Sequence, residues 1–310
     1  MKKPINVVVA LWMLAAATAP HGQEKKGLIT LSGAWAIYPT AVAWGEAFQK
    51  FNPGVKINVS AGGVGKGAAD VIAGLSDIGM VSRDPNPAEV KKGIVPVYVL
   101  HDAVFPVVSD KNPVLDELLK KGIKKETWTA ICVNGTVAKW DEATDKKVNR
   151  SIHVFTRSDI CGAAACWAAF LGKKQEDLRG IGVYGDPGLI EAVRRDPIGI
   201  GYSNFSYVFT REGALVPGIR LVPIDANNNG VADEGEVYAS RADAVKAIHM
   251  GTYPATRRNF FYVKGKPQGI VKAFIQFALS DEGAKIVEET RTSLPLSKEE
   301  RMSALTAIQE

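Results

Sequence analysis

Short apolar runs alternate along this chain with longer segments in which apolar residues recur at helical spacing. The apolar runs predict strands at about 28–31, 55–59, 77–81, 94–100, 103–108, 151–156, 198–202, 221–224 and 260–263. The helical pattern predicts helices at about 39–51, 61–74, 114–120, 125–134, 161–171, 241–249, 268–279 and 281–291. Strands that alternate with helices in this way indicate an α/β fold.

The first residues have the pattern of a secretory signal peptide. Met1, Lys2 and Lys3 form a basic start, an apolar run covers 5–17, and small residues continue to Ala19. We assign 1–22 to the signal and leave the cleavage site open between Ala19 and Gly27. The apolar run is too short for a spanning helix. This first segment contains no cysteine, so we do not expect a lipid anchor at the N-terminus. These features predict a periplasmic or secreted protein.

Charge and cysteine content narrow the classes of partner and site. Without Lys2 and Lys3, 36 of the 38 basic residues remain against 33 acidic ones, which is too even a balance to indicate a nucleic-acid partner.

The three cysteines are Cys132, Cys161 and Cys166. Export permits a disulfide, and five-residue spacing on a helix points Cys161 away from Cys166. We therefore expect a bridge from Cys132 to one of the other two.

Three turns share one design, in which a strand is followed by small residues and then by a helix start. They are SGAWAIYP at 32–39, GGVGKG at 62–67 and RSDICGAAA at 157–165. Helix N-termini expose unpaired N–H groups, and small residues let a ligand approach them, so several such turns together would bind an anion. Arg83 and Arg157 would add forked donors. The alternative is that these are ordinary strand–helix turns with surface arginines.

An ordered set of segments resembles the periplasmic phosphate-binding proteins that serve ABC importers. The set comprises GGVGKGAADVIAGLSDIGMVSRD, WTAICVNGTVAKWDE, VFTRSDICGAAACWAAF, DPIGIGYSNFSY and YPATRRNFFYVKGKPQGIVKAFIQFALSDEGAKIVE. The resemblance implies the two-lobed, type II-like periplasmic-binding-protein fold, with the ligand cleft between α/β lobes. The implied lobes are 28–104 plus 252–310, and 105–251.

The same resemblance implies a binding protein that captures phosphate or a related small oxyanion and delivers it to the membrane subunits of an ABC importer. The implied ligand-binding positions are Ala34, Trp35, Ala36, Val64, Gly65, Ser82, Arg83, Arg157, Asp159, Cys161, Gly162 and Ala163. Several positions that carry hydroxyls in the family hold Ala, Val or Cys here, and each lost hydrogen bond to a charged ligand costs about 1.5–3 kcal/mol. The alternative is a related binding fold with altered or lost ligand specificity that acts as a structural or signalling protein. Cys161 has no histidine nearby in the sequence, so the chain is not expected to be an enzyme.

The stretch DANNNGVADEGE at 225–236 matches a twelve-position calcium loop. Oxygen ligands would come from Asp225, Asn227, Asn229, the Val231 carbonyl, Asp233 and a bidentate Glu236. Gly230 at position six allows the sharp turn that this loop requires. The alternative is a polar loop rich in Asn and Gly. We expect bound Ca²⁺ with a structural role, because there is one loop and it follows a strand, whereas sensors pair loops between helices.

Overall fold

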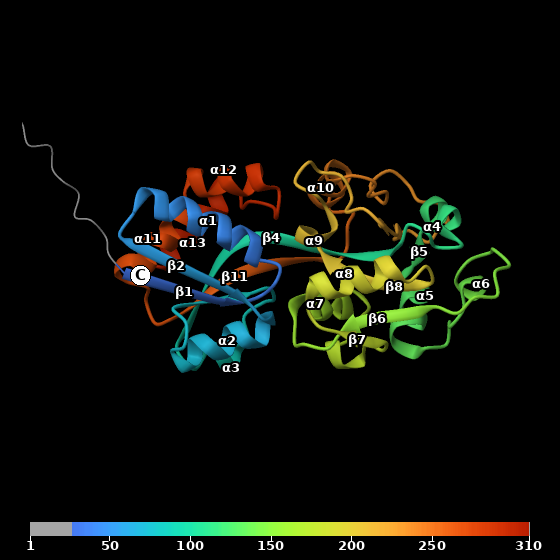
Figure 1. Ribbon diagram of the computed structural model, residues 1–310, viewed down its shortest axis with the longest axis horizontal. Coiled ribbons are helices and arrows are strands. Elements are labelled where there is room, and N and C mark those ends of the chain that lie inside the picture. Colours follow the sequence, from blue (N-terminus) through green and yellow to red (C-terminus); the bar gives the residue numbers. More distant parts are fainter. Residues whose placement is uncertain (1–26, 310) are drawn as a thin grey trace, which may run out of the picture.

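Two long strands, β4 (Ile94–Ser109) and β11 (Thr256–Lys264), pair antiparallel through the middle of the molecule (Figure 1). The computed structural model describes residues 27–309, so the predicted signal peptide lies outside the described residues. The main sheet has the strand order β2-β1-β3-β11-β4-β8-β6-β7, and β9 pairs with β4. The two central strands therefore connect the two halves of one continuous sheet.

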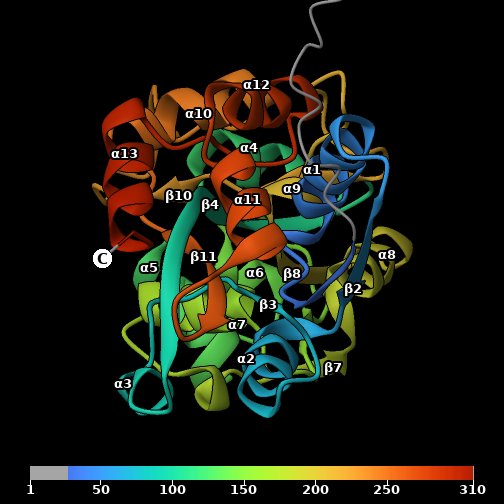
Figure 2. The ribbon, with the colours of Figure 1, turned by 90° about the vertical axis from the view of Figure 1, so that its left-hand side faces the viewer.

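The first half of the sheet carries helices on both faces. Its elements are β1 (Gly27–Gly33), α1 (Tyr38–Phe51), β2 (Val55–Ala61), α2 (Gly63–Ala73), β3 (Ile78–Val81), α3 (Pro87–Val90), α11 (Gly269–Ala278), α12 (Asp281–Thr290) and α13 (Lys298–Ala307). Helices α1, α11 and α12 lie on one face and α2 on the other (Figures 1 and 2). Because both faces are covered, β3 is apolar and fully buried.

The second half contains shorter elements and more loops. Its elements are α4 (Leu115–Lys121), β5 (Ile123–Lys124), α5 (Lys125–Thr129), a π-helix (Ala130–Asn134), α6 (Trp140–Ala143), β6 (His153–Arg157), α7 (Gly162–Phe170), a 3₁₀ turn (Gln175–Asp177), β7 (Ile181–Val183), α8 (Gly185–Arg195), β8 (Gly199–Asn204), α9 (Phe205–Val208), β9 (Ile219–Leu221), β10 (Ile224–Asp225) and α10 (Arg241–His249). A separate two-stranded sheet joins β10 to β5 in parallel. None of the described helices is long and apolar enough to cross a membrane.

Each half has its own hydrophobic core. One core draws on residues from 29–100 and 260–308, and we call this half lobe 1. The other draws on 103–255 together with Leu294, and we call it lobe 2. Along the chain, buried residues switch from the lobe 1 core to the lobe 2 core between Leu100 and Ala103 on β4. They switch back between Ala255 and Phe260 around β11. Within residues 27–309, only the two central strands, which belong to both lobes, cross between them as regular structure.

The two strands predicted at 94–100 and 103–108 are one strand, and that prediction was wrong. His101 and Asp102 interrupt the apolar pattern but not the backbone. Asp102 is buried and pairs with Arg257 on β11, so a polar residue is accommodated within the strand by its neighbour. Helices α8 and α13 were not predicted.

Candidate functional site

The turns before α1, α2 and α7 meet at one enclosed hollow between the lobes. We call it the inter-lobe hollow. It is lined by Ala34, Trp35, Ala36, Gly63, Val64, Ser82, Arg157, Cys161, Gly162, Ala163, Asp186 and Asn204. Nine of the twelve positions expected to bind the ligand are in this lining. The space between them does not admit a water-sized sphere, so a ligand must enter through separation of the lobes.

Arg157 is the only basic side chain in this lining. It lies at the end of β6 with its side chain 1% exposed. Its Nε and Nη2 donate to the two oxygens of Asp159 at 2.8 and 2.6 Å, and Nη1 donates to Asp186. Burial by itself lowers the pKa of Arg157, but the attraction of Asp186 and Asp159 outweighs it, and the pKa lies above its usual value. A guanidinium has five N–H groups, so two remain for a ligand.

Asp186 and Asn204 also line the hollow, and the sequence did not point to either. Asp186 is the second residue of α8 with its side chain 1% exposed, and it accepts from the Ser203 hydroxyl at 3.1 Å and the backbone N–H of Asn204 at 3.2 Å. Asn204 ends β8, and its side-chain oxygen accepts from Arg257. The sequence does show a polar residue near the start of α8, the Asp of GDPGLI, and another at the end of β8, the Asn of GIGYSN. Polar residues in these positions could have marked the site.

Close contacts around the rim hold the lobes together. An added Cβ on Gly162 would lie 2.1 Å from the Ser82 carbonyl oxygen and 2.2 Å from its hydroxyl oxygen. The Gly65 N–H approaches the Ile160 carbonyl at 3.4 Å. An added Cβ on Gly63, where φ is +86°, would lie 2.8 Å from Asp159 Oδ2. Glycine at these positions allows the two backbones to approach each other over the hollow.

Trp35 closes another side of the hollow. Its indole reaches from lobe 1 to lobe 2, where an added Cβ on Gly185 would lie 3.2 Å from the ring. Ring centroids of Tyr184 and Tyr207 lie 6.1 and 6.5 Å away in edge-on geometry. The Tyr207 hydroxyl donates to the Trp35 carbonyl at 3.3 Å. The indole Nε1 is buried and has no hydrogen-bond partner.

Cys161 caps α7, and its sulfur accepts from the Ala164 N–H at 3.3 Å. Burial is the main reason that its pKa is raised to about 12, which Arg157 only partly offsets. The thiol is therefore protonated at neutral pH. All three cysteines are free, so the predicted disulfide from Cys132 was wrong. Cys132 is buried in the lobe 2 core.

Three expected ligand positions do not line the hollow. Asp159 lies behind Arg157 and orients it. Gly65 faces Ile160 at the rim. Arg83 turns away and forms a two-pronged pair with Glu89, at 2.7 and 3.1 Å. The sequence could not show that Glu89, six residues later, already binds this guanidinium.

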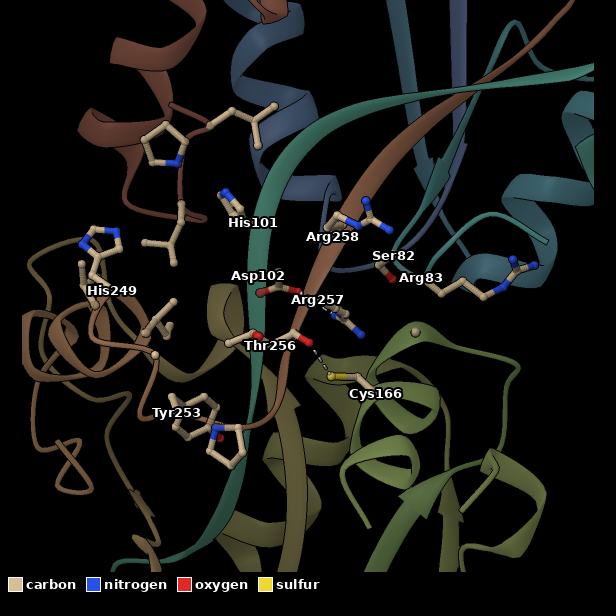
Figure 3. A pocket seen from close by; sticks show the side chains of 18 of the residues that line it. Ser82, Arg83, His101, Asp102, Cys166, His249, Tyr253, Thr256, Arg257 and Arg258 are labelled. Atoms are coloured by element: carbon tan, nitrogen blue, oxygen red, sulfur yellow. Dashed lines mark hydrogen bonds and ion pairs between the residues drawn. The ribbon is translucent and has the colours of Figure 1, made fainter. Parts of the chain in front are cut away.

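A larger cavity of about 1250 Å³ lies beside β4 and β11 and shares Ser82 and Gly162 with the hollow (Figure 3). Asp102 and Arg257 face each other across these strands within it. Its arginines and acids balance four against four, namely Arg83, Arg241, Arg257 and Arg258 against Asp84, Asp102, Glu288 and Glu300. The turns before α1 and α2 do not line this cavity, whereas all three turns line the smaller hollow, and we therefore assign the candidate site to the hollow.

The predicted calcium loop is a folded turn in lobe 2. Asp225 is 1% and Glu236 5% exposed. The Asp225 carboxylate accepts from the N–H groups of Asn229 and Gly230, and Glu236 accepts from those of Ala226 and Asp233. Asn227 and Asn229 both donate to Asp233. Within residues 27–309, no three His, Cys, Asp or Glu side chains are gathered as a metal site. The oxygen-rich donors nevertheless have the chemistry that Ca²⁺ prefers.

Comparisons with known proteins agree with this architecture. The phosphate-binding protein PstS of Bacillus subtilis is 27% identical, and the alignment covers 94% of this chain and 92% of that protein. Protein SphX of Synechococcus elongatus is also 27% identical, over 89% and 81%. The crystal structure of a putative phosphate ABC transporter substrate-binding protein from Clostridium perfringens, with bound phosphate, aligns with a TM-score of 0.72. It is 24% identical and covers 87% of this chain and all of that one.

The fold predicted from the sequence, two α/β lobes with the ligand cleft between them, is confirmed by that structural similarity. The family model described as PBP superfamily domain matches residues 16–282. This match covers most of the chain, including the three turns that form the inter-lobe hollow and both central strands. The chain therefore belongs to the PBP superfamily.

Proposed function

We propose that this chain is an exported substrate-binding protein that captures phosphate or a related small oxyanion and delivers it to the membrane subunits of an ABC importer. The names of its relatives support this, because they include phosphate-binding proteins and a phosphate ABC transporter substrate-binding protein. The signal-like start of the sequence supports export.

The inter-lobe hollow is the observation on which the proposal rests. The starts of α2 and α7 and the turn before α1 lie around one buried guanidinium. Helix N-termini and a guanidinium with two free N–H groups are donors suited to a dehydrated oxyanion. Because the donors come from both lobes, binding would hold the lobes closed.

The same hollow supports binding rather than catalysis. Its one nucleophile, Cys161, is buried with a pKa raised to about 12 by that burial. No histidine is among the residues that line the hollow, so no general base of that kind is close to the thiol. A function as carrier requires neither group.

Isothermal titration calorimetry of the mature protein with inorganic phosphate tests the proposal. We expect saturable 1:1 binding, much weaker binding of sulfate, and loss of binding in Arg157→Gln. Arg179→Gln is the matched control, because the Arg179 guanidinium donates to the Asn134 carbonyl in lobe 2 and does not line the hollow. This variant should bind phosphate as the wild type does. Absence of binding to phosphate, sulfate and molybdate would refute the proposal.

We also propose that the loop 225–236 binds Ca²⁺ as a structural clamp. Asp225 and Glu236 are buried carboxylates whose hydrogen bonds come from backbone N–H groups of their own loop. Buried charge is costly without a counter-ion, and a cation would supply one. The loop is also attached to its surroundings, since Ala232 N–H donates to the Lys120 carbonyl and Thr252 Oγ1 to that of Gly235. A bound ion would therefore fix the segment that leads into β11.

Calcium titration with thermal unfolding tests this second proposal. Calcium at 100 times its Kd raises the free energy of unfolding by about 2.7 kcal/mol, and EDTA removes that gain. Asp225→Ala should abolish both the binding heat and the gain. Glu234→Ala is the control from the same loop, because Glu234 is exposed, lies outside the ligand positions and pairs with Lys246. Equal unfolding temperatures of the wild type in calcium and in EDTA would contradict the proposal.

A further inference from the structure

The walls of the inter-lobe hollow are poor in side-chain donors. Ala34, Ala36, Val64 and Ala163 contribute methyl groups, and the neutral side-chain donors are the Ser82 hydroxyl, the Asn204 amide and the Cys161 thiol. Arg157 contributes the two N–H groups that its aspartates leave free. The helix N-termini add backbone N–H groups, and a further side-chain donor would lower the cost that remains for each unpaired oxygen of a buried oxyanion.

The indole of Trp35 carries a further donor in the same wall. Its Nε1 is buried, has no hydrogen-bond partner, and lies 3.5 Å from the position of an added Cβ on Gly185. The Gly185 N–H in turn donates to Asp159 Oδ1, which also accepts from Arg157 Nε. Gly185 therefore lies against both the indole and the aspartate that orients the guanidinium.

We propose that Trp35 is a specificity-determining ligand contact, whose indole N–H donates to the bound oxyanion and whose ring restricts the site to bare, unesterified oxyanions. This inference rests on the proposed function. The first part follows from the unpartnered donor. The second follows from size, because the hollow does not admit a water-sized sphere and the ring is fixed against Gly185, Tyr184 and Tyr207. Once the lobes have closed, the ring again lies against Gly185 and fills this side of the hollow, so an ester group placed there would have to displace the indole.

Two substitutions at Trp35 separate the donor from the ring. Trp35→Phe keeps an aromatic ring and removes the N–H, and Trp35→Ala removes both. The matched control is Trp128→Phe, because Trp128 Nε1 is likewise buried without a partner but lies in the lobe 2 core against Trp167. Calorimetry uses inorganic phosphate and glycerol 3-phosphate, and the unfolding temperature of each variant is recorded.

We expect Trp35→Phe to weaken phosphate binding about 10- to 100-fold, the range for loss of one hydrogen bond to a charged group. Trp128→Phe should stay within twofold of the wild type. Trp35→Ala should bind glycerol 3-phosphate at least 10-fold more tightly than the wild type does. Phosphate affinity of Trp35→Phe within twofold of the wild type overturns the donor role, and wild-type binding of both ligands with equal affinity overturns the size restriction. A wild type that binds none of phosphate, sulfate, molybdate and glycerol 3-phosphate refutes the proposed function itself.

Discussion

Gly162→Ala tests whether the lobes close over the ligand as they do here. Gly162 is the first residue of α7, and alanine is favoured over glycine in a helix by about 1 kcal/mol, so the change does not weaken lobe 2 locally. The added methyl group would lie 2.1 Å from the Ser82 carbonyl oxygen and 2.2 Å from its hydroxyl oxygen. Both are at the end of β3 in the other lobe, so relief of the clash requires lobe separation.

The size of the effect follows from that overlap. A carbon–oxygen contact of at least roughly 3.1 Å requires the two segments to move apart by about 1 Å, since packed atoms cannot interpenetrate. A hydrogen bond of about 2.9 Å that is lengthened by about 1 Å lies beyond the distance range of hydrogen bonds and is lost. If the ligand keeps its lobe 2 donors and loses two from lobe 1, the loss is about 3 kcal/mol or more at 1.5 kcal/mol each. We therefore expect phosphate affinity to fall by about 100-fold or more.

Calorimetry with phosphate measures this loss, and small-angle scattering with excess phosphate should show a more open variant. Gly65→Ala is the matched control at the same rim. Its added Cβ would lie 3.3 Å from the Ile160 side chain, which can shift slightly, and we expect less than a fivefold change. A Gly162→Ala protein with wild-type affinity would show that the ligand is not held by this closed arrangement, and the reasoning would fail.

Three further changes test the charges and the thiols. Asp186→Asn should lower the free energy of unfolding by about 2 kcal/mol in urea, because the charge-assisted bond from Arg157 is weakened, and it should tighten sulfate binding relative to phosphate binding by removing a negative charge from the hollow. Arg257→Met leaves Asp102, 1% exposed, without its cation and should cost about 3–5 kcal/mol in the same assay. Burial raises the pKa of the Cys132 thiol from 9.0 to about 12, so the unfolded state ionises first and the stability from this group, present below pH 9, is lost as pH rises. Cys132→Ala should therefore lack about 1 kcal/mol of the decline in unfolding free energy that the wild type shows between pH 9 and 10.

The sequence predicted the elements whose hydrophobic period is clear. Helix α1 was placed within one residue, because Pro39 marks its first turn and Asn52 its end. The end of the chain was less readable, since α13 buries only Ala304 and has a weak apolar stripe. Helix α8 was missed because glycine and proline at its start indicated a loop, although Leu189, Ile190 and Val193 bury one face.

The candidate site was predictable where backbone determines it and not where side chains meet across the sequence. Small residues after a strand marked the turns at 32–39, 62–67 and 157–165, and all three line the hollow. The partners of the arginines could not be read in the same way. Arg83 pairs with Glu89 and Arg157 with Asp186, and the choice depends on tertiary geometry. Only the structure distinguishes the arginine in the wall from the one outside it.

Arg157 contributes orientation to this site rather than net positive charge. With Asp159 and Asp186 it forms a buried group with one positive and two negative charges. Such a group attracts no anion at a distance, so the affinity must come from directed N–H groups whose cost of ordering is met during folding. In Asp186, which lines the hollow, Oδ2 accepts a single hydrogen bond from Arg157 and retains a lone pair. An oxyanion that carries a proton can donate to such an acceptor, whereas fully ionised sulfate has nothing to donate and meets only repulsion. The Asp186 carboxylate in the hollow is therefore consistent with selection for hydrogen phosphate.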